Sequence, residues 1–337
     1  MEYLPDLIES INAQTFQDFS VLIIDNASND GVEQFVREKY PNITFIRNVR
    51  NLGFSSAHNQ GIRYAFKKWE GTSLDDKFVL VTNPDIILSP TFLENMAQGV
   101  EGRNDFGSFG GKLLRAFGDG VADEVLKETI KSDRFDSTGL NFQKNFTFTD
   151  RGAGELDEGQ FENQEEVFGI SGALVLYRAS ALEEVRFNDE FFDIDFFAYK
   201  EDVDLAYRLQ YAGWRSLYIP FAVAYHFRGV YGKEKMGFFE RIKNRRSKSK
   251  QLSFYSTRNH WLLILKNIDP VSLIVNLPRL VFAEVARTTY VLIFEPRNII
   301  VFTDMFRLVP KIAKKRSHIL KNKKTSGRNI RKQFVCR

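Results

Sequence analysis

Two short clusters of acidic and amide residues stand where the sequence predicts that buried strands end. Asp25 closes the apolar run at residues 19–25 and opens the segment DNASNDG, and Asp85 ends the Asn-Pro-Asp turn after the apolar run at 77–83. In an open α/β sheet, ligands bind beyond the carboxyl ends of the strands. A carboxylate just outside the second strand could hold a divalent cation through its hard oxygen atoms. Turns and helix caps are the alternative explanation, and they account for Ser28 better than for Asp25, which still belongs to the strand.

A third cluster lies in the segment FFDIDFFAYKEDVDLAYRLQYAGW at residues 191–214. Glu201, Asp202 and Asp204 crowd the first turn of a helix that this segment predicts. Acids at a helix N-terminus stabilise the helix dipole, and Asp204 can also pair with Arg208 one turn later. This structural explanation accounts well for one acid and poorly for three. The surplus of carboxylates marks the start of the helix as a candidate site.

His226, in the segment AYHFRG, is a further candidate ligand. An isolated histidine is ordinarily a satisfied surface or core residue. This one follows a predicted strand and has acidic residues upstream, and neutral imidazole is a common ligand of divalent metals. We therefore include His226 among the candidate metal ligands.

The elements that must position these side chains alternate between helical and strand patterns over the first 115 residues. Apolar residues spaced three and four apart predict a helix at 4–11, and continuous apolar runs predict the two buried strands named above. Further elements are expected at 32–40 (helix), 43–47 (strand), 55–68 (helix) and 90–96 (helix). This alternation predicts an α/β sheet.

The pattern changes after residue 115. Residues 115–165 carry many Gly, Asp and Thr and predict loops and short strands over the edge of the sheet, whereas 167–182 predict a strand that runs into a short helix. Residues 252–309 are helical in pattern and rich in apolar side chains, with few charges grouped on one side. We expect this part to lie against a surface rather than to pass through a membrane.

Composition excludes several classes of protein. The chain has 337 residues, of which 43% are hydrophobic, so it can bury a full core. Cys336 is its single cysteine, which excludes an intramolecular disulfide and suits a reducing cytosol. No apolar run approaches the ~20 residues that cross a bilayer, and the first ten residues lack the pattern of a signal peptide. We expect a cytoplasmic protein that neither spans a membrane nor is secreted.

The net charge of +4 hides a strong asymmetry along the chain. Residues 1–227 hold 21 basic and 37 acidic residues, whereas 228–258 hold 10 and 2, and 311–337 hold 11 and none. A basic rear joined to an acidic front suggests that the rear faces a polyanion, either anionic lipid or nucleic acid. The alternative for residues 316–337 alone is a solvated, disordered tail.

Taken in order, the motifs resemble those of glycosyltransferase family 2, in particular its bacterial rhamnosyltransferase-like members. They are DNASNDG, NLGFSSAHNQG (51–61), NPD, GISGALVLYRASAL (169–182), FFAYKEDVDLAYRLQYAGW and His226. Each motif alone is weak, but their order across residues 4–226 is a specific signal. The resemblance implies a GT-A fold, with a mixed sheet flanked by helices. It also implies a divalent metal, Mg²⁺ or Mn²⁺, and inversion at the anomeric carbon of the sugar.

The resemblance also implies roles for single residues in catalysis. Asp202 would be the catalytic base that takes the proton of the acceptor hydroxyl as it attacks the anomeric carbon. Glu201, Gly172 and Trp214 would lie near this site, on the acceptor side or as structural support.

The same resemblance assigns further residues to the sugar donor and to the metal. Asp85 would be the retained acid of the family's Asp-x-Asp metal motif, and His226 would assist the metal. The metal would stabilise the charge that develops on the departing diphosphate. The residues assigned to the donor are Asp25, Asn51, Gly53, Asn59 and Asn83, of which Asn83 replaces the first acid of the metal motif.

One departure from the family pattern concerns the start of the chain. Family members normally begin with a buried central strand and a Thr-Tyr-Asn-like turn before the helix that starts here near Tyr3. This sequence lacks that strand. We expect either a further segment upstream or the loss of a strand and of part of the nucleoside pocket, and the intact later motifs favour the upstream segment.

The expected organisation has four parts. They are a GT-A catalytic domain at 1–227, a basic linker or arm at 228–258, an amphipathic helical region at 259–315 that associates with a membrane, and a disordered basic tail at 316–337. The expected activity moves a sugar, with rhamnose as one candidate, from a nucleoside diphosphate to a glycan or lipid-linked acceptor in cell-surface polysaccharide synthesis. The protein would bind the anionic inner face of the plasma membrane peripherally, and a homodimer is the alternative use of its apolar faces.

Three rival interpretations stay open at this point. A non-catalytic, membrane-associated relative is the main one, because the absent strand could abolish donor binding. A nucleic-acid binder that uses the basic tail is less favoured, since no recognisable reading motif supports it. A nucleotidyltransferase would need a Gly-rich phosphate loop near the N-terminus, and neither that loop nor a dinucleotide or P-loop motif occurs.

Overall fold

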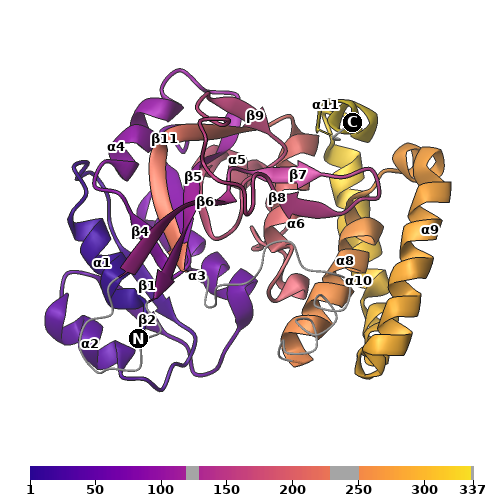
Figure 1. Ribbon diagram of the computed structural model, residues 1–337, viewed down its shortest axis with the longest axis horizontal. Coiled ribbons are helices and arrows are strands. Elements are labelled where there is room, and N and C mark those ends of the chain that lie inside the picture. Colours follow the sequence, from indigo (N-terminus) through magenta and orange to yellow (C-terminus); the bar gives the residue numbers. More distant parts are fainter. Residues whose placement is uncertain (119–128, 228–249, 335–337) are drawn as a thin grey trace.

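The computed structural model describes residues 1–118, 129–227 and 250–334. Figure 1 shows a part built around a sheet on the left and a group of long helices on the right. The helices of the sheet-containing part are α1 (Leu4–Asn12), α2 (Val32–Lys39), α3 (Gly53–Lys68), α4 (Phe92–Val100), α5 (Ala179–Glu184), the 3₁₀ turn η1 (Ile194–Phe196) and α6 (Glu201–Ala212). Its strands are β1 (Leu22–Asp25), β2 (Thr44–Arg47), β3 (Phe78–Thr82), β4 (Ile86–Leu88), β5 (Phe106–Gly118), β6 (Thr129–Ser137), β7 (Leu140–Phe142), β8 (Phe148–Asp150), β9 (Glu165–Val167), β10 (Leu174–Arg178) and β11 (Arg215–Phe227).

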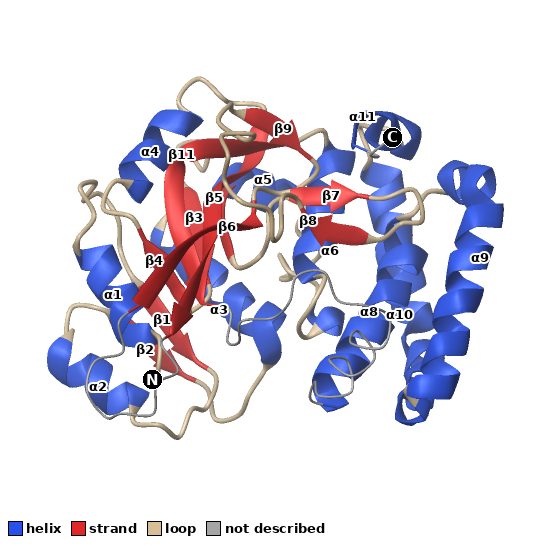
Figure 2. Ribbon diagram, in the orientation of Figure 1, coloured by secondary structure: helices blue, strands red, loops and turns tan. Residues whose placement is uncertain are grey.

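The central sheet is mixed, with its strands in the order β3-β10-β5-β11-β4, and β6 and β9 pair at its margins with β5 and β11. Strand β11 runs parallel to β5 and antiparallel to β4, and β10 is antiparallel to both β3 and β5. Helices flank this sheet, as Figure 2 shows. The predicted α/β class with a mixed sheet and flanking helices is confirmed.

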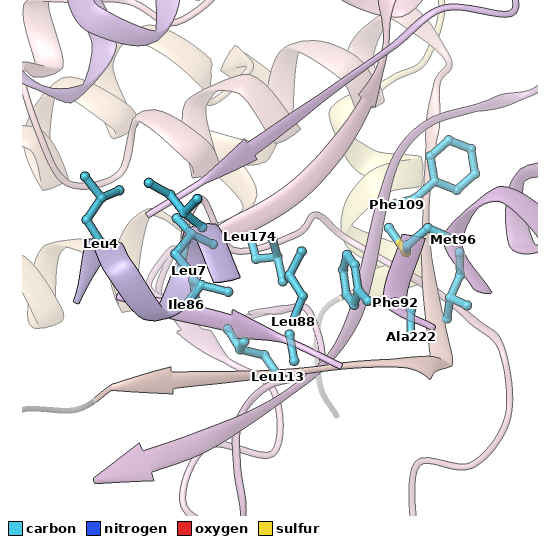
Figure 3. Packing of buried hydrophobic residues seen from close by; sticks show 14 of the residues in the cluster. Leu4, Leu7, Ile86, Leu88, Phe92, Met96, Phe109, Leu113, Leu174 and Ala222 are labelled. Atoms are coloured by element: carbon cyan, nitrogen blue, oxygen red, sulfur yellow. The ribbon is translucent and has the colours of Figure 1, made fainter. Parts of the chain in front are cut away.

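Apolar helix faces build the core on the sheet. Leu7 of α1 and Phe92 and Met96 of α4 are buried against Ile86 and Leu113 of the sheet (Figure 3). Because residues on one face of a helix recur every three to four positions, Phe92 and Met96 point to the same side of α4. A second cluster joins α3, α5 and α6 to β10 and β11. The start of α6, which carries the acidic cluster, is therefore anchored to the sheet.

Strands β1 and β2 form a separate parallel pair, with Asp25 opposite Arg47. Within the described residues, β1 pairs only with β2, and β3 pairs only with β10. Residues 1–3, which precede α1, form no strand. In the part of the chain that the structure describes, no strand therefore joins β1 to β3. The sequence departs from the family pattern at this place.

Residues 115–165 differ from the expectation of loops and short strands. Strand β5 occupies the middle of the sheet and continues to Gly118, and β6 pairs alongside it over nine residues. Only β7, β8 and β9 are short, with three residues each. The prediction was wrong for β6 and for the end of β5, because the many Gly, Asp and Thr residues of this stretch suggested turns although the backbone is paired.

The rear of the chain is helical. It consists of α8 (Lys250–Asn267), α9 (Pro270–Phe294), the 3₁₀ turn η2 (Pro296–Ile299), α10 (Ile300–Asn322) and α11 (Gly327–Phe334). These helices share a core with α6 and with the β7–β8 hairpin. In the described residues, no helix is both long enough and apolar enough to cross a bilayer.

Two boundary predictions need correction. The expected arm at 228–258 lies outside the described residues as far as 249, and its last residues begin α8. The tail expected to be disordered from 316 is helical at 316–322 and 327–334, because Ile319 and Ile330 are buried in the shared core. The many lysines and arginines of the tail obscured these two anchors in the sequence.

Candidate active site

The start of α6 presents Asp202 to a backbone N–H group. Its Oδ2 accepts a hydrogen bond from Gly172 N at 2.9 Å, and its Oδ1 accepts one from Val203 N at 2.8 Å. Burial raises the pKa of Asp202, and these two N–H groups offset part of that rise. A carboxylate with a raised pKa is a stronger proton acceptor, so Asp202 is suited to act as a general base. The structure thus brings together Asp202 and Gly172, which the sequence had placed at one site.

Glu201 is buried beside Asp202, with 6% of its surface exposed, and its Oε2 has no hydrogen-bond partner among the described residues. Burial and the charge of Asp202 raise the pKa of Glu201 to about 8. Glu201 is therefore mostly neutral near neutral pH, and the two adjacent acids sit in different surroundings, because only Asp202 accepts hydrogen bonds from two backbone N–H groups. Such a difference is common where paired carboxyl groups have different tasks.

The turn at 171–173 also connects Asp202 to the second acidic cluster. Asn83 N donates a hydrogen bond to Ala173 O at 2.9 Å, next to the glycine that holds Asp202. Two residues further on, Asp85 O accepts from Phe227 N at 2.9 Å, which ties this turn to the end of β11. The Asn-Pro-Asp turn and the start of α6 are therefore neighbours in the fold.

Asp85 directly precedes β4 and His226 lies on β11, and their side chains face each other. The Nε2 atom of His226 lies 3.3 Å from Asp85 Oδ1, and its Nδ1 atom lies 2.7 Å from Oδ2 of the buried Asp136. Burial lowers the pKa of His226, but the hydrogen bonds to Asp136 and Asp85 outweigh it and raise the pKa to about 9. Without a bound cation, this imidazole is protonated near neutral pH.

The donor set at Asp85 and His226 fits a divalent cation. Asp85 Oδ1 is buried and lies 3.3 Å from Nε2 of His226, the ring nitrogen that Asp136 leaves available. A metal-binding histidine commonly directs its other nitrogen to a carboxylate in this way. Within the described residues, no group of three or more acidic, histidine or cysteine side chains could hold a metal. A cation here needs further oxygen ligands from a substrate, as Mg²⁺ usually does.

Asp25 is buried at the end of β1, with 5% of its surface exposed. Its carboxylate accepts a hydrogen bond from Ser28 N at 3.0 Å and lies 3.5 Å from Arg47 Nε. The turn after β1 therefore uses part of this side chain, and the pairing of β1 with β2 supplies the arginine.

The segment at 51–61, which the sequence assigned to the sugar donor, folds back onto this turn. Asn26 Nδ2 donates to Gly53 O at 3.2 Å, and Gly53 N donates to Asn51 Oδ1 at 2.8 Å. Gly53 has a φ of 79°, and a Cβ atom there would lie 2.6 Å from the ring of Phe197. Any side chain at position 53 is therefore excluded. The segment at 51–53 lies against the loop that leads into α6.

Two residues predicted at the site have other positions. Asn59 is 1% exposed, and its amide forms hydrogen bonds with the backbone of Phe191 and Phe192. It therefore holds this backbone segment in place and does not line a pocket. Trp214 follows the C-terminal end of α6, about 18 Å along the helix from Asp202 at the usual rise per residue. Its Nε1 atom donates to Glu184 at 2.9 Å. Because Trp214 and Asp202 belong to one sequence motif, the sequence suggested that they lie close together. The length of the helix between them prevents this.

Asn259 of α8 is a residue that the sequence did not indicate. Its Nδ2 atom lies 2.7–2.8 Å from the carbonyl oxygens of Phe196, Ala198 and Tyr199, in the loop that leads into α6. This loop has positive φ angles at Phe197, Tyr199 and Lys200. Left-handed conformations are costly for residues other than glycine, so the surrounding structure must hold them. A fully buried side chain from the rear helices therefore holds the loop before Asp202.

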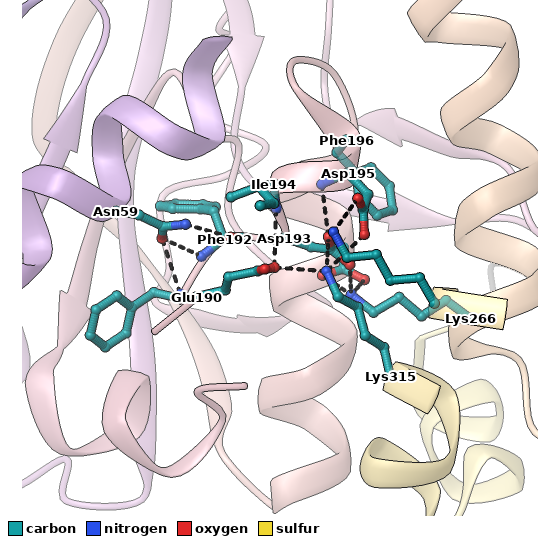
Figure 4. A network of polar contacts seen from close by, with 12 residues as sticks. Asn59, Glu190, Phe192, Asp193, Ile194, Asp195, Phe196, Lys266 and Lys315 are labelled. Atoms are coloured by element: carbon teal, nitrogen blue, oxygen red, sulfur yellow. Dashed lines mark hydrogen bonds and ion pairs between the residues drawn. The ribbon is translucent and has the colours of Figure 1, made fainter. Parts of the chain in front are cut away.

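A buried ion network ties the same loop to α8 and α10 (Figure 4). Lys266 and Lys315 each lie 2.5 Å from Asp193, and Lys315 also contacts Glu190 and Asp195. The two ammonium groups lower the pKa of Asp193 against the effect of burial. Asp-x-Asp at 193–195 was visible in the sequence, but its lysine partners lie 73 and 122 residues away from Asp193.

The chain is similar to known proteins in sequence and in fold. A sequence model described as glycosyl transferase family 2 matches residues 1–186, and one described as glycosyl transferase family group 2 matches residues 141–283. N-acetylglucosaminyl-diphospho-decaprenol L-rhamnosyltransferase of Mycobacterium tuberculosis is 29% identical over 229 residues, which are 66% of this chain and 71% of that protein. Rhamnosyltransferase WbbL of Escherichia coli K12 is 27% identical over 231 residues, or 67% and 79% of the two chains.

Among solved structures, the crystal structure of GalNAc-T7 with UDP, GalNAc and Mn²⁺ matches with a TM-score of 0.60 and 10% identity. The match covers 98% of this chain and 54% of that one, so the chain spans about half the length of that structure. At this identity, the likeness concerns the fold alone.

Proposed function

Because the chain belongs to glycosyltransferase family 2 and has the GT-A fold, we propose that it transfers a sugar from a nucleoside diphosphate to a hydroxyl group with inversion at the anomeric carbon. The observation that carries this proposal is the position of Asp202, a buried carboxylate held by Gly172 N and tied through the turn at 171–173 to the Asn-Pro-Asp turn. Inversion needs one base and a leaving group on opposite sides of one carbon, and in this proposal Asp202 stands on the first side and the Asn-Pro-Asp turn on the second.

Asp202 performs the proton transfer in this mechanism. Its carboxylate accepts the proton of the acceptor hydroxyl while that oxygen attacks the anomeric carbon from the side opposite the diphosphate. Gly172 N holds Oδ2 and orients the group before the acceptor arrives. The neutral Glu201 beside it avoids a second negative charge at the base.

Asp85 and His226 would hold Mg²⁺ or Mn²⁺, and Asp136 would orient the imidazole from behind. A divalent cation stabilises the negative charge that develops on a departing diphosphate. Asp25 at the end of β1 is proposed to contact the nucleoside, and Asn51, Gly53 and Asn83 to line the donor side. The polar turns after β1 and β3 and the loop at 51–53 supply the hydrogen-bonding groups for this role.

The names of the relatives guide the choice of substrates. Two relatives are named rhamnosyltransferases, and one of these names includes a diphospho-decaprenol acceptor. We therefore propose rhamnose as the first donor sugar to test and a lipid-linked glycan as the acceptor class, in cell-surface polysaccharide synthesis. An acceptor of this kind would be met at the anionic cytoplasmic face of a membrane.

A sugar-transfer assay tests the activity. The purified chain is given a panel of nucleoside diphosphate sugars, headed by nucleoside diphosphate rhamnoses that differ in their base, and a lipid-linked acceptor, with Mg²⁺ or Mn²⁺ present. NMR of the product then gives the anomeric configuration. A product with the configuration opposite to that of the donor supports the proposal, and retention of configuration contradicts it.

A catalytically impaired relative is the second candidate function. It is favoured by the sheet, because β1 and β3 have no common neighbour among the described residues and the nucleoside side of the site depends on β1. Calorimetric titration of the nucleotide separates the two candidates. A transferase binds the nucleoside diphosphate in the presence of the metal, and an impaired relative does not.

A further inference from the structure

Helix α9 has its apolar side chains on the outside. Ile274, Val275 and Phe282 have 70%, 72% and 79% of their surface exposed. An amphipathic helix on a globular domain normally turns its apolar face toward the core. The other exposed large apolar residues of α9 are Val271, Leu277, Val281, Val285, Leu292 and Ile293. A continuous exposed face of this kind marks a site of interaction.

The side of α9 that faces the protein carries polar groups. Asn276 is buried and donates to Ser272 O at 2.7 Å, and Glu284 accepts hydrogen bonds from His260 and Trp261 of α8 at 2.8 and 2.7 Å. The bonds that Glu284 accepts from α8, together with the bond that Arg331 of α11 donates to Asn276 Oδ1 at 2.6 Å, fix the rotation of α9 about its own axis, whereas the bond from Asn276 to Ser272 lies within α9. The apolar face therefore points outward because polar contacts hold the helix in that orientation.

The charge around this face is basic. The exposed charged residues of α9 and η2 are Arg279 and Arg297. The two acids in this stretch are only partly exposed and are bonded within the protein, Glu284 to α8 and Glu295 to Ser253 at 2.7 Å. The apolar face is thus bordered by cations without exposed anions among them.

A groove lies beside the apolar face, between α9 and the turn that joins β7 to β8. The turn supplies Gln143, Lys144 and Asn145, and α9 supplies Arg279, Phe282 and Arg287. Figure 1 shows this hairpin reaching toward α9. Among the described residues, no carboxylate lines the groove, and Arg287 at its margin is paired with Glu284, with 3.5 Å between Nε and Oε2. The two remaining cations, Lys144 and Arg279, and two amides around one hollow suit the oxygen atoms of a phosphate group.

We propose that α9 is embedded in the surface layer of an anionic membrane, with its exposed apolar side chains among the acyl chains and a lipid phosphate in the groove at Lys144 and Arg279. An interfacial helix combines an apolar face, which enters the acyl boundary, with cations that meet the headgroups. Each cation near an anionic leaflet adds to the attraction, and salt weakens it.

A second copy of this chain is the competing occupant, and the charges argue against it. In a two-fold dimer, each patch meets the same patch of its partner. The basic groove and the arginine border would then face each other, and juxtaposed like charges are unfavourable. An anionic lipid surface has the complementary charge. This inference rests on the proposed function in one respect, which is the reason that the enzyme would need a membrane. Binding to vesicles itself requires neither the sugar donor nor the acceptor.

Flotation of the full chain with vesicles tests the apolar face. Vesicles of phosphatidylcholine with phosphatidylglycerol are compared with phosphatidylcholine alone, at low and high salt. The double variant Ile274→Glu/Phe282→Glu should lower the partition coefficient roughly tenfold to hundredfold, because two buried apolar contacts are lost. Phe221→Glu is the matched control, since Phe221 is 62% exposed on β11 and its carbonyl oxygen accepts a hydrogen bond from Asn95 of α4, on the sheet-containing part. It should float like the unchanged protein.

A second pair of variants tests the groove. Lys144→Glu/Arg279→Glu should reduce binding to anionic vesicles at least about tenfold and leave the weak binding to neutral vesicles unchanged. Lys67→Glu, at an exposed lysine of α3, should have a much smaller effect. Added inorganic phosphate should not compete at millimolar concentration, because the proposed ligand is a phosphate fixed in a bilayer.

Several outcomes would overturn the inference. They are flotation that does not depend on anionic lipid, equal loss with Phe221→Glu, and a dimer in sedimentation velocity that Phe282→Glu converts to monomer while vesicle binding stays the same. Circular dichroism and sugar transfer to a water-soluble acceptor are measured on each variant. Transfer that persists without vesicle binding leaves the proposed function intact, and vesicle binding without transfer leaves this inference intact.

Discussion

Gly172 N donates a hydrogen bond to Oδ2 of Asp202 at 2.9 Å, across 30 residues of sequence. This contact joins the turn before β10 to the first turn of α6. It fixes one oxygen of the proposed base and leaves the other to accept from Val203 N. The glycine is needed for space, because a Cβ atom at position 172 would lie 3.1 Å from the Cβ atom of Asp202.

Gly172→Ala should lower turnover about tenfold or more, since a small displacement of a catalytic group is costly. Donor affinity should change little, because the new methyl group meets Asp202 and not the donor motifs. Gly61→Ala is the control. Its Cβ atom would be 3.3 Å from the flexible end of Ile24, and normal turnover is expected. An unchanged kcat for Gly172→Ala would show that the contact does not orient the base.

Glu201→Gln should change how the stability of the protein depends on pH. The pKa of Glu201 rises from 4.5 to about 8 on folding, through burial and then the charge of Asp202. Its contribution to stability is fully present below pH 4.5 and is lost as the pH rises to 8 and beyond, because the unfolded chain then releases a proton that the folded chain retains. The loss is on the order of a few kcal/mol for a pKa difference of this size.

Urea unfolding at a series of pH values measures this effect. The unchanged protein should lose stability between pH 5 and 8 more steeply than Glu201→Gln, which cannot ionise at that position. Glu70→Gln, at an exposed residue of the turn after α3, serves as the control and should keep the steep profile. Parallel profiles for all three proteins would contradict the assignment of a neutral Glu201.

Asp136→Asn should weaken Mn²⁺ binding roughly 10- to 100-fold, as is typical when the carboxylate behind a metal-binding histidine is removed. The amide keeps the shape of the side chain but no longer fixes the imidazole as a carboxylate does. Calorimetric titration with Mn²⁺ in the presence of a nucleoside diphosphate measures the change. Asp133→Asn, at an exposed position of the same strand, should bind the metal normally. Equal affinities for the two variants would remove His226 from the metal site.

Asn259→Ala should lower kcat by about 10- to 100-fold with little change in donor affinity, because the loop before Asp202 loses its amide contacts. Asn276→Ala also removes a buried asparagine of the rear helices, but its contacts lie within α9 and with Arg331. Both variants should lose stability. Only the first should lose turnover at a temperature where both are folded, and an equal loss in both would reduce the role of Asn259 to general stability.

The proximity of Asp202 to Gly172 and of Asp85 to His226 could be predicted because these residues lie in local motifs. Asp85, Asp202 and His226 each stand at the end of a predicted strand or the start of a predicted helix, where a fold of this class positions its ligands. Helix α1 followed from apolar spacing alone. In these cases, the sequence neighbours of a residue determine both its element and its face.

The remaining parts depend on contacts between distant segments. Strand β5 was missed because no element was assigned to most of its residues, among which Gly110 and Gly111 allow Ile170 and the backbone of Ala222 to approach closely. Asn259 and Asp136 gave no signal, since each acts on residues 60 or more positions away. Trp214 was misplaced because a shared motif was taken to mean a shared location, although a helix of 12 residues separates its two ends.

The most direct test of the account is the turnover of Asp202→Asn together with its donor affinity. The amide keeps the shape of the side chain but cannot accept the proton of the acceptor. The account predicts that transfer falls roughly 100-fold or more while the dissociation constant of the donor changes little. A variant that transfers sugar at a near-normal rate would contradict the assignment of Asp202 as the base, and with it the mechanism proposed for this site.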